Sequence, residues 1–355
     1  MRIFERLDEL YAIGDRIGYS PEEDAAHELA AAWFRKAGLE VEVDAGGNLI
    51  GRVPGGTREI WTGSHLDTVP AGGRFDGALG VVAGLEAVER LGLPGLGVVV
   101  FRDEERGCAG SRARVASGSL PDAFLELHIE QGPRLDGVGA PLAVVPAIVG
   151  YVRGTVVVAG RAGHAGTTPM EGRDDALVAA AARIFAIREA ALSIPEAVAT
   201  VGQLSVEPGG INVIPAAVTL SVDARAPDVE RLDMLVAALG IEPTLRVEPV
   251  AMDADVCTAG RSAIESLGLP VVDLHSGAGH DAGILAAAGV PSAMLFVRSL
   301  NGGISHSPDE HSSDEDILLA VDALERALRN VASSLGVSAT ESSSRRECGA
   351  TPAPV

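Results

Sequence analysis

A glycine-rich stretch at residues 63–77 brings together three side chains that can bind a metal ion: His65, Asp67 and Asp76. It directly follows an apolar run that ends at Thr62. Divalent metal ions accept imidazole nitrogen and carboxylate oxygen as ligands, and glycines let the backbone fold closely around the ion. The stretch therefore predicts part of the active site of a metallohydrolase, whose remaining ligands must lie further along the chain.

Three later segments offer those ligands. An apolar run at 98–101 leads into Glu104 and Glu105. On an extended chain these two side chains point to opposite sides, so one can bind metal while the other carries protons. His128 lies near the end of a second strand-like run, and His306 lies in a glycine-rich loop after a third. Because open α/β sheets form their binding crevice at the carboxyl ends of the strands, we expect these residues to converge.

Each motif alone has a plainer explanation. A single His-x-Asp is a weak signal, an Asp-Glu-Glu run is usually a solvated turn, and His128 alone could be a hydrogen-bonded strand histidine. The coincidence of four glycine-flanked or strand-exit motifs in one chain favours the metal site. Together they offer two metal ions a shared carboxylate, one further carboxylate and three histidines.

The combination resembles the amidase/hydantoinase/carbamoylase branch of the M20 metallopeptidase family. That branch includes N-carbamoyl-L-amino acid hydrolases, β-ureidopropionases and allantoate amidohydrolases. Besides the first stretch and the loop that holds His306, the matching segments are 46–51, 126–133, 164–170, 211–215, 223–225 and 276–282, in family order over residues 1–330. The motif Glu-Leu-His-Ile-Glu-Gln-Gly-Pro at 126–133 separates this branch from ordinary M20 peptidases, which generally have an acidic ligand there.

The resemblance implies two divalent metal ions per subunit, zinc or manganese, with cobalt or nickel also acceptable to such a ligand set. It implies that Asp76 bridges the ions. His65 and His128 then complete the ligands of one ion, and Glu105 and His306 those of the other. The implied reaction is hydrolysis of the carbamoyl C–N bond of a small ureido acid, which releases carbon dioxide, ammonia and an amino acid.

Three catalytic roles follow from the same resemblance. Glu104 is the implied general base, and Asp67 the partner that orients His65, since a metal-bound imidazole usually needs one. His164 is expected to reach the active site of the other subunit of a homodimer and to donate to the developing oxyanion. The alternative for His164 is an ordinary turn histidine.

The implied substrate contacts are Gln131, Asn212, Arg225 and Gly303. Arg225 can grip an α-carboxylate with two parallel hydrogen bonds, and its alternative is a salt bridge to Asp223 or Asp228. His280 and Asp281 are expected to support the site from a tight turn rather than to bind metal.

The chain departs from the family between Glu105 and His128, where only 22 residues intervene and the usual longer, partly helical insertion is missing. Arg106 stands where the family usually has a glycine. This shortened wall keeps two alternatives open, an M20-type aminoacylase or dipeptidase and a catalytically inactive, metal-stabilised binding protein. Cys108 could be a nucleophile, but a small buried thiol is the favoured interpretation.

Composition limits the remaining possibilities. The chain has 355 residues, 47% of them hydrophobic but only 3% aromatic, so we expect a core of aliphatic side chains. A formal charge of −21 argues against nucleic acid or an anionic membrane as partner, because both are held through clustered Lys and Arg. Three unpaired-looking cysteines and the lack of a signal or membrane segment lead us to expect a cytoplasmic protein.

The elements that must position these residues indicate an α/β fold. Residues 2–38 predict two amphipathic helices, and a helix is also predicted at 78–91. Between and after them, strands are predicted near 40–52, 58–62, 97–102 and 123–130. This alternation predicts a helix-covered mixed, mainly parallel sheet. Later elements are expected as strands at 149–159, 199–206 and 217–226 and as helices at 174–191 and 314–335.

We therefore predict two domains. Residues 1–146 and 255–336 form a discontinuous catalytic domain, and residues 147–254 form an inserted α+β lid or dimerisation domain. Residues 337–355 are rich in Ser, Thr and Pro and predict a disordered tail.

Overall fold

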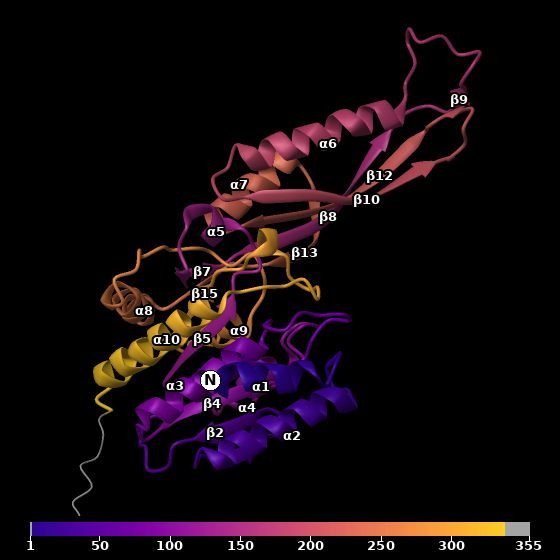
Figure 1. Cartoon of the computed structure of the whole chain (residues 1–355). Coiled ribbons are helices and arrows are strands. Elements are labelled where there is room, and N and C mark those ends of the chain that lie inside the picture. The colour runs from indigo at the N-terminus through magenta and orange to yellow at the C-terminus, as the bar shows by residue number, and fades with distance from the viewer. Residues whose placement is uncertain (1, 338–355) are drawn as a thin grey trace, which may run out of the picture.

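A seven-stranded sheet lies at the centre of the larger part of the molecule (Figure 1), in a computed structural model that describes residues 2–337. Its strands, in spatial order, are β1 (Glu40–Val43), β2 (Leu49–Arg52), β4 (Leu96–Phe101), β3 (Ile60–His65), β5 (Ala123–Ile129), β15 (Ser292–Val297) and β6 (Leu142–Val145). The four strands β4, β3, β5 and β15 are parallel to one another, and the outer strands pair antiparallel. The predicted mixed sheet is confirmed in this form.

Helices cover both faces of this sheet. They are α1 (Arg2–Tyr11), α2 (Pro21–Lys36), α3 (Ala78–Leu91), α4 (Ala109–Ser117), α5 (Arg134–Val138), α8 (Ala254–Ser266), α9 (Asp281–Ala287) and α10 (Asp314–Ser334). Glycines of α3 lie directly over Thr62 and Ser64. On the opposite face the Arg114 guanidinium of α4 lies 4.8 Å from the centre of the Trp61 ring. Successive residues of a strand point to opposite faces, so α3 and α4 enclose β3 between them.

The start of α2 connects the N-terminal helices to the site loop. Ser20 accepts a hydrogen bond from the Glu23 backbone N–H (3.2 Å), as the capping motif predicts. The Glu23 carboxylate, fully buried, also accepts from the backbone N–H of Tyr19 and of Asp103, the latter at 3.0 Å. Helix α2 is therefore tied to the segment that carries Glu104 and Glu105.

The prediction that a strand ends at Thr62 is wrong, because β3 continues to His65. Its last three residues pair in parallel with Val99 to Phe101 of β4. A side chain at Gly63 would put its Cβ only 1.9 Å from the Val99 carbonyl oxygen, so glycine is required for this close pairing. His65 thus belongs to the sheet and not to the loop.

The predicted strand at 40–52 is two strands, β1 and β2, which pair antiparallel. Asp44 makes the turn between them, since its Oδ1 accepts hydrogen bonds from the backbone N–H of Gly46 (2.9 Å) and Asn48 (3.0 Å). A short polar side chain that bonds to the backbone ahead of it is a strong local turn signal.

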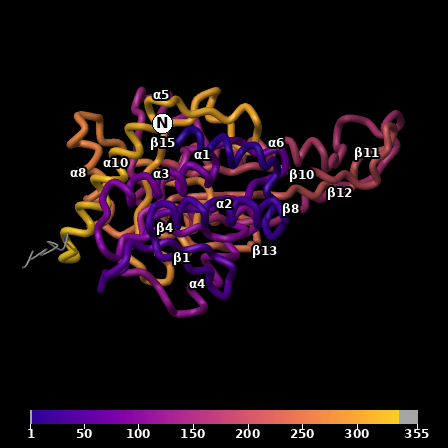
Figure 2. Tube along the Cα trace, turned by 60° about the horizontal axis from the view of Figure 1, so that its bottom comes forward, coloured from indigo at the N-terminus to yellow at the C-terminus, as the bar shows by residue number. Residues whose placement is uncertain are grey.

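A second, four-stranded antiparallel sheet forms the other part of the molecule. Its strands, in spatial order, are β10 (Val198–Glu207), β12 (Ala217–Ala226), β8 (Gly150–Ala159) and β13 (Glu242–Val247). Helices α6 (Ala176–Leu192) and α7 (Val229–Leu239) pack on one face and close a separate core around Val222 and Leu235. Figures 1 and 2 show this part extending away from the larger sheet.

Two short ribbons lie at the ends of this second sheet. β9 (Gly163–His164) and β11 (Val213–Ile214) form its outer tip, and β7 (Ala147–Ile148) pairs with β14 (Val250–Ala251) where the chain passes to and from the larger sheet (Figure 1). The domain boundaries and the lid or dimerisation role stay predictions. Of the predicted tail at 337–355, residues 338–355 lie outside the described residues. Within residues 2–337, no helix is long and apolar enough to cross a membrane.

Candidate metal centre

The predicted ligands lie along one edge of the seven-stranded sheet because they follow parallel strands. His65 is the last residue of β3, and His128 is the last but one of β5. Glu104 and Glu105 follow β4, and His306 lies in the loop after β15. Since the carboxyl ends of parallel strands meet at the same edge, four segments distant in sequence reach one place.

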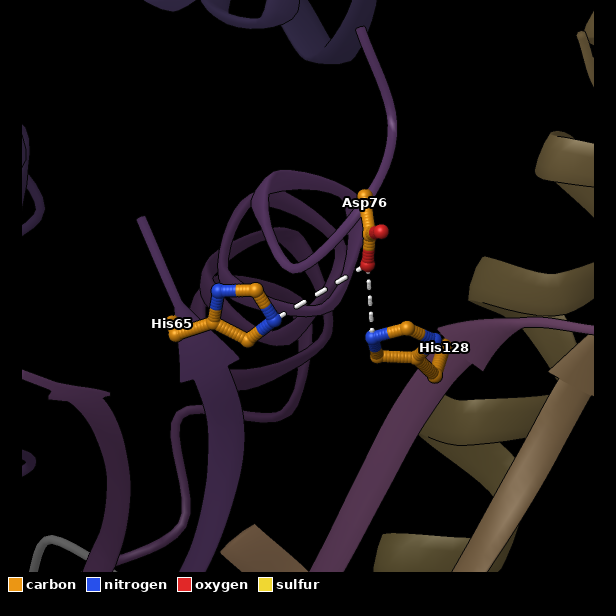
Figure 3. A group of neighbouring side chains, drawn as sticks. All are labelled: His65, Asp76 and His128. Carbon is orange, nitrogen blue, oxygen red and sulfur yellow. Dashed lines mark ion pairs between the residues drawn. The ribbon is translucent and has the colours of Figure 1, made fainter. Parts of the chain in front are cut away.

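One candidate group consists of His65, Asp76 and His128, all buried (Figure 3). Asp76 Oδ1 lies 3.1 Å from His128 Nε2 and 3.9 Å from His65 Nε2. Asp76 precedes α3, and both imidazoles point toward its carboxylate. One ligand atom from each residue lies within 4.8 Å of the others, close enough to surround one ion.

A second group uses the other oxygen of the same aspartate. Asp76 Oδ2 lies 3.4 Å from His306 Nε2, which in turn lies 3.3 Å from Glu105 Oε2. The remaining oxygen, Glu105 Oε1, is buried and has no hydrogen-bond partner among the described residues. A buried carboxylate oxygen without a donor is costly unless a cation binds it, so this donor set fits a divalent metal ion. The assignment of the five ligands stays a prediction.

The histidines are held with their Nε2 atoms free for this purpose. His128 Nδ1 lies 2.9 Å from the Ile129 carbonyl oxygen, and His65 Nδ1 lies 3.1 Å from the Asp67 carbonyl oxygen and 3.3 Å from its Oδ1. An N–H on Nδ1 would satisfy these acceptors and leave Nε2 to face Asp76.

Asp67 also fixes the two glutamates. Its carboxylate oxygens accept hydrogen bonds from the backbone N–H groups of Glu104 (3.0 Å) and Glu105 (3.1 Å). One fully buried side chain therefore sets the position of His65 relative to the glutamate loop, which agrees with the orienting role expected for Asp67.

Opposite charges accumulate in the cluster. Burial alone would favour neutral groups, but the hydrogen bond to Asp76 raises the pKa of His128 to about 9. The contact with Asp76 likewise raises the pKa of His306 to about 9. Despite its burial, Asp76 has a pKa well below its ordinary value because both histidines bond to it. Protons thus occupy the positions where metal ions would bind, and metal binding must displace them.

Glu104 lies beside the first group without belonging to it. Its Oε2 is 3.8 Å from His65 Nε2, and burial raises the pKa of its carboxyl to about 8. A carboxylate with a pKa near neutrality is well matched to general base catalysis. Cys108 lies behind it, with Sγ 3.8 Å from Glu104 Oε1, and burial raises the pKa of this thiol. A buried neutral thiol is a poor nucleophile, so the favoured interpretation of Cys108 stands.

Two of the four predicted substrate contacts, Gln131 and Arg225, lie at the site, and Gly303 packs against the residue that follows Gln131. Gln131 donates from Nε2 to Asp76 Oδ2 at 2.8 Å, and a Cβ on Gly303 would meet the Gly132 backbone at 2.1 Å. Arg225 donates to Asp223 Oδ1 and to the Gly277 carbonyl oxygen, each at 2.8 Å, so the salt-bridge alternative for Arg225 is present in the structure. Gln131 and Arg225 line a cavity of about 670 Å³ together with Asp76, Glu104, Glu105, His128 and His306.

His164 and Asn212 do not lie in this cluster. The Asn212 carbonyl oxygen accepts from the backbone N–H of Ala165 at 3.0 Å, so both residues belong to the outer tip of the second sheet. Figure 1 places β9 at the end of the molecule away from β3 and β5, and the His164 side chain is exposed. Within one chain these two residues are not brought to the candidate ligands.

Two residues that sequence analysis missed hold Asp76 in place. Glu310 Oε1 accepts hydrogen bonds from the backbone N–H of Phe75 (2.8 Å) and of Asp76 (3.0 Å), and Ser305 Oγ lies 3.3 Å from Asp76 Oδ2. Both lie in the polar run 305–310 around His306, but nothing in that run points to Asp76.

Buried side chains pack under His128, and among them His280 was predicted to support the site whereas Glu126 was not. The His280 ring packs 4.5 Å from the His128 ring, and Glu126 accepts from Ser64 Oγ (2.6 Å) and from the backbone N–H of Ala282 (2.9 Å). These contacts agree with a supporting role for the turn that begins α9. Glu126, His128 and His280 also form a third group with metal-binding geometry, which shares His128 with the first.

Comparison with known proteins finds relatives that are named as amidohydrolases, deiminases and amidases. The model for peptidase family M20/M25/M40 matches residues 61–330. The chain is 37% identical to the N-carbamoyl-L-amino acid amidohydrolase of Geobacillus stearothermophilus, over 91% of this chain and 96% of that protein. It is 32% identical to allantoate deiminase 1 of Glycine max, over 89% and 86%. An amidase of the hydantoinase/carbamoylase family from Burkholderia multivorans matches with a TM-score of 0.84 at 31% identity, over 92% of this chain and 96% of that chain.

The chain is shorter than these relatives. Its alignment with the Geobacillus protein spans 395 positions, whereas the chain has 355 residues, so that relative contains segments that this chain lacks.

Proposed function

The chain belongs to peptidase family M20/M25/M40, and from this membership we propose that it cleaves the carbamoyl C–N bond of a ureido acid. The substrate is an N-carbamoyl-L-amino acid or a related ureido acid such as allantoate, in line with the names of its relatives. Hydrolysis releases carbon dioxide, ammonia and an amino acid or its equivalent.

The observation that carries the proposal is the position of Asp76. Its two carboxylate oxygens face two different histidine groups, with Glu105 in the second and Glu104 beside the first. This arrangement supports two divalent ions, zinc or manganese, held by His65, Asp76 and His128 on one side and by Asp76, Glu105 and His306 on the other. Divalent ions in such sites polarise a carbonyl oxygen and lower the pKa of water to about 7.

The side chains of the protein complete the reaction. A ureido carbonyl is a poor electrophile because two nitrogens donate into it, so both water and carbonyl must be activated. Glu104 takes a proton from the attacking water and returns it to the departing nitrogen, a role worth about 10²–10⁴-fold. Asp67 fixes the positions of Glu104 and His65 relative to each other, because its carboxylate accepts the Glu104 backbone N–H and contacts His65 Nδ1. Gln131 and Arg225, which both line the cavity, orient the substrate.

The proposal includes a homodimer. Helix α6 exposes Val178, Phe185 and Leu192, seven residues apart on one side of the helix, and β10 is an unpaired edge of the second sheet. Exposed apolar stripes and free strand edges favour association. A partner subunit would then supply His164 and Asn212, which their own chain keeps away from its metal groups.

An aminoacylase or dipeptidase of the same family is the second candidate, favoured by the short segment after Glu105. Metal-stripped enzyme, reloaded with Mn²⁺ or Zn²⁺, should be assayed for ammonia release from N-carbamoyl-L-amino acids, N-carbamoyl-β-alanine and allantoate. N-acetyl amino acids and dipeptides serve as the comparison set. Metal-dependent ammonia release is the expected result, and turnover of only the comparison set would replace the proposal by the second candidate.

A further inference from the structure

The face of the second sheet that lacks helices carries a cluster of charged residues beside the cavity. Arg153 pairs across β8 and β12 with Asp223, and Tyr151 pairs with Arg225. The Tyr151 ring contacts both arginines, with the guanidinium carbons of Arg153 and Arg225 at 5.0 and 5.5 Å from its centre. Tyr151, Arg153 and Arg225 all line the cavity that contains the metal ligands.

The two arginines differ in how far their donors are used. Arg225 bonds through Nε and Nη2 to Asp223 and through Nη1 to the Gly277 carbonyl oxygen. Arg153 bonds to Asp223 only through Nε, at 2.9 Å. Among the described residues its two terminal nitrogens have no hydrogen-bond partner, and its side chain is 52% exposed. Arg153 therefore offers a free pair of donors at the cavity wall.

On the cavity wall away from the metal ligands, the local charge is opposite in sign to that of the protein as a whole. The chain has a formal charge of −21, yet Arg112, Arg153 and Arg225 all line this cavity. The one carboxylate on the wall away from the metal ligands is Glu248, which accepts from Arg246 at 2.6 and 3.1 Å, and Arg246 also pairs with Asp233 at 2.7 Å. Asp223 carries one negative charge and pairs with both Arg153 and Arg225, so these three residues together keep a net positive charge. The α-carboxylate of a substrate requires only one of the two arginines.

We propose that Arg153 binds a second carboxylate of the substrate, which makes the N-carbamoyl derivatives of acidic amino acids the substrate class of this enzyme. The inference rests on the proposed function and narrows it. Arg225 takes the α-carboxylate, and Arg153, on the neighbouring strand and in contact with the same tyrosine ring, takes the side-chain carboxylate. A planar guanidinium with two free donors matches a carboxylate in a bidentate contact.

The test compares N-carbamoyl-L-glutamate with N-carbamoyl-L-glutamine, which has nearly the same shape but no side-chain charge. We expect the metal-loaded wild type to prefer the glutamate derivative in kcat/KM by about tenfold or more. Arg153→Met should lower kcat/KM for the glutamate derivative by about 10- to 100-fold and change that for the glutamine derivative by less than about threefold. Arg153→Lys should recover part of the loss.

Arg112→Met is the matched control, because it removes a positive charge from the same cavity and should leave the glutamate-to-glutamine ratio within about threefold of wild type. Asp223 keeps Arg225 as a partner in Arg153→Met, so we expect the variant to fold, and its melting curve verifies this. An equal loss for both substrates, or no preference in the wild type, would overturn the inference.

A binding measurement tests this inference independently of the proposed function. The Glu104→Gln variant, loaded with metal, can be titrated calorimetrically with the same two compounds. Tighter binding of the glutamate derivative, lost on adding Arg153→Met, would support Arg153 as a carboxylate site even if no ureido acid is hydrolysed. Ureido hydrolysis without any such difference would leave the proposed function intact and remove the inference.

Discussion

At the scale of single residues, Glu104 and Cys108 are neighbours that the structure distinguishes by their environment. Glu104 faces His65 with one carboxylate oxygen, whereas the buried Cys108 lies next to its other oxygen. Glu104→Gln keeps the shape and the backbone bonds to Asp67 but removes the base. We expect kcat to fall by about 10²–10⁴-fold while the bound metal, measured by elemental analysis, stays unchanged.

Cys108→Ala is the control for that experiment. Because the thiol is neutral and contacts no ligand atom of the metal groups, its removal should leave kcat within a few fold of wild type. A Glu104→Gln variant as active as Cys108→Ala would show that another group acts as the base.

His27 provides a test of stability that is independent of the metal centre. It is 6% exposed in α2, and burial lowers its pKa to about 3. An unfolded histidine has a pKa of about 6.5, so the unfolded chain takes up a proton at a pH where the folded chain does not. Stability is therefore complete above about pH 6.5 and falls as the pH drops toward the folded value.

Between about pH 8 and about pH 5, His27 should account for a loss of about 2 kcal/mol in the free energy of unfolding. His27→Met has no such titration and should lose correspondingly less over the same range. Denaturant unfolding of both proteins at the two pH values measures the difference. Parallel pH dependence in wild type and variant would mean that His27 is protonated in the folded protein.

At the scale of elements, the loop from 102 to 108 is held against the connection between α1 and α2. Arg106 donates to Asp103 Oδ1 and to the Gly18 carbonyl oxygen, each at 2.7 Å. A Cβ on Gly18 would lie 1.8 Å from Asp103 Oδ1, so glycine is needed for this approach. The residue that departs from the family pattern thus helps to position Glu104 and Glu105.

Arg106→Ala should weaken metal binding by about tenfold. Removing a group that orients metal ligands typically costs about 10- to 100-fold, and we expect the lower value because the Arg106 side chain is 56% exposed. Competition with a chelating dye measures this affinity. Arg58→Ala is a matched control, since Arg58 is 55% exposed and pairs with Asp122 at 2.6 Å, and these two residues precede β3 and β5, whose other ends carry the ligands His65 and His128. Equal affinities in the two variants would remove Arg106 from the support of the site.

The sequence predicted correctly those helices and strands whose hydrophobic pattern and end signals lie within the element itself. Helix α3 begins and ends at the predicted residues 78 and 91, and β12 at 217 and 226. The end of β3 was misplaced because Gly63, Ser64 and His65 have poor strand propensity and join the sheet only through pairing with β4. Strand propensity is a local property and does not reflect a pairing partner 36 residues further along the chain, as Val99 is from Gly63.

The same limit applies to the site. Ligands marked by glycine-rich or strand-exit motifs could be found, and the structure brings all five together. Glu310 could not be identified, because its role depends on accepting two backbone N–H groups more than two hundred residues earlier. Nothing in an isolated Asp-Glu pair indicates that bond. Likewise, the free donors of Arg153 become visible only when β8 and β12 pair.

At the scale of the whole molecule, the position of the second sheet raises the question of how its tip takes part in catalysis. Strand β9, which ends at His164, lies at the far end of the molecule from β5 (Figure 1), and His164 Nδ1 accepts from the backbone N–H groups of Gly166 and Thr167. These bonds fix the ring and leave Nε2 to point elsewhere. A symmetric dimer through α6 and β10 would bring each tip toward the other subunit.

If the protein forms this dimer, we predict that mixing two inactive variants restores enzymatic activity. His164→Ala lacks the residue supplied to its partner, and Glu104→Gln lacks its own base, so each homodimer should be nearly inactive. Mixed at equal amounts under conditions that allow subunits to exchange, half of the dimers should be mixed and each should contain one complete site, giving about a quarter of wild-type activity. Ammonia release before and after mixing measures this. Activity that stays at the level of the separate variants, although size-exclusion and native mass analysis show mixed dimers, would mean that His164 acts within its own chain or not at all.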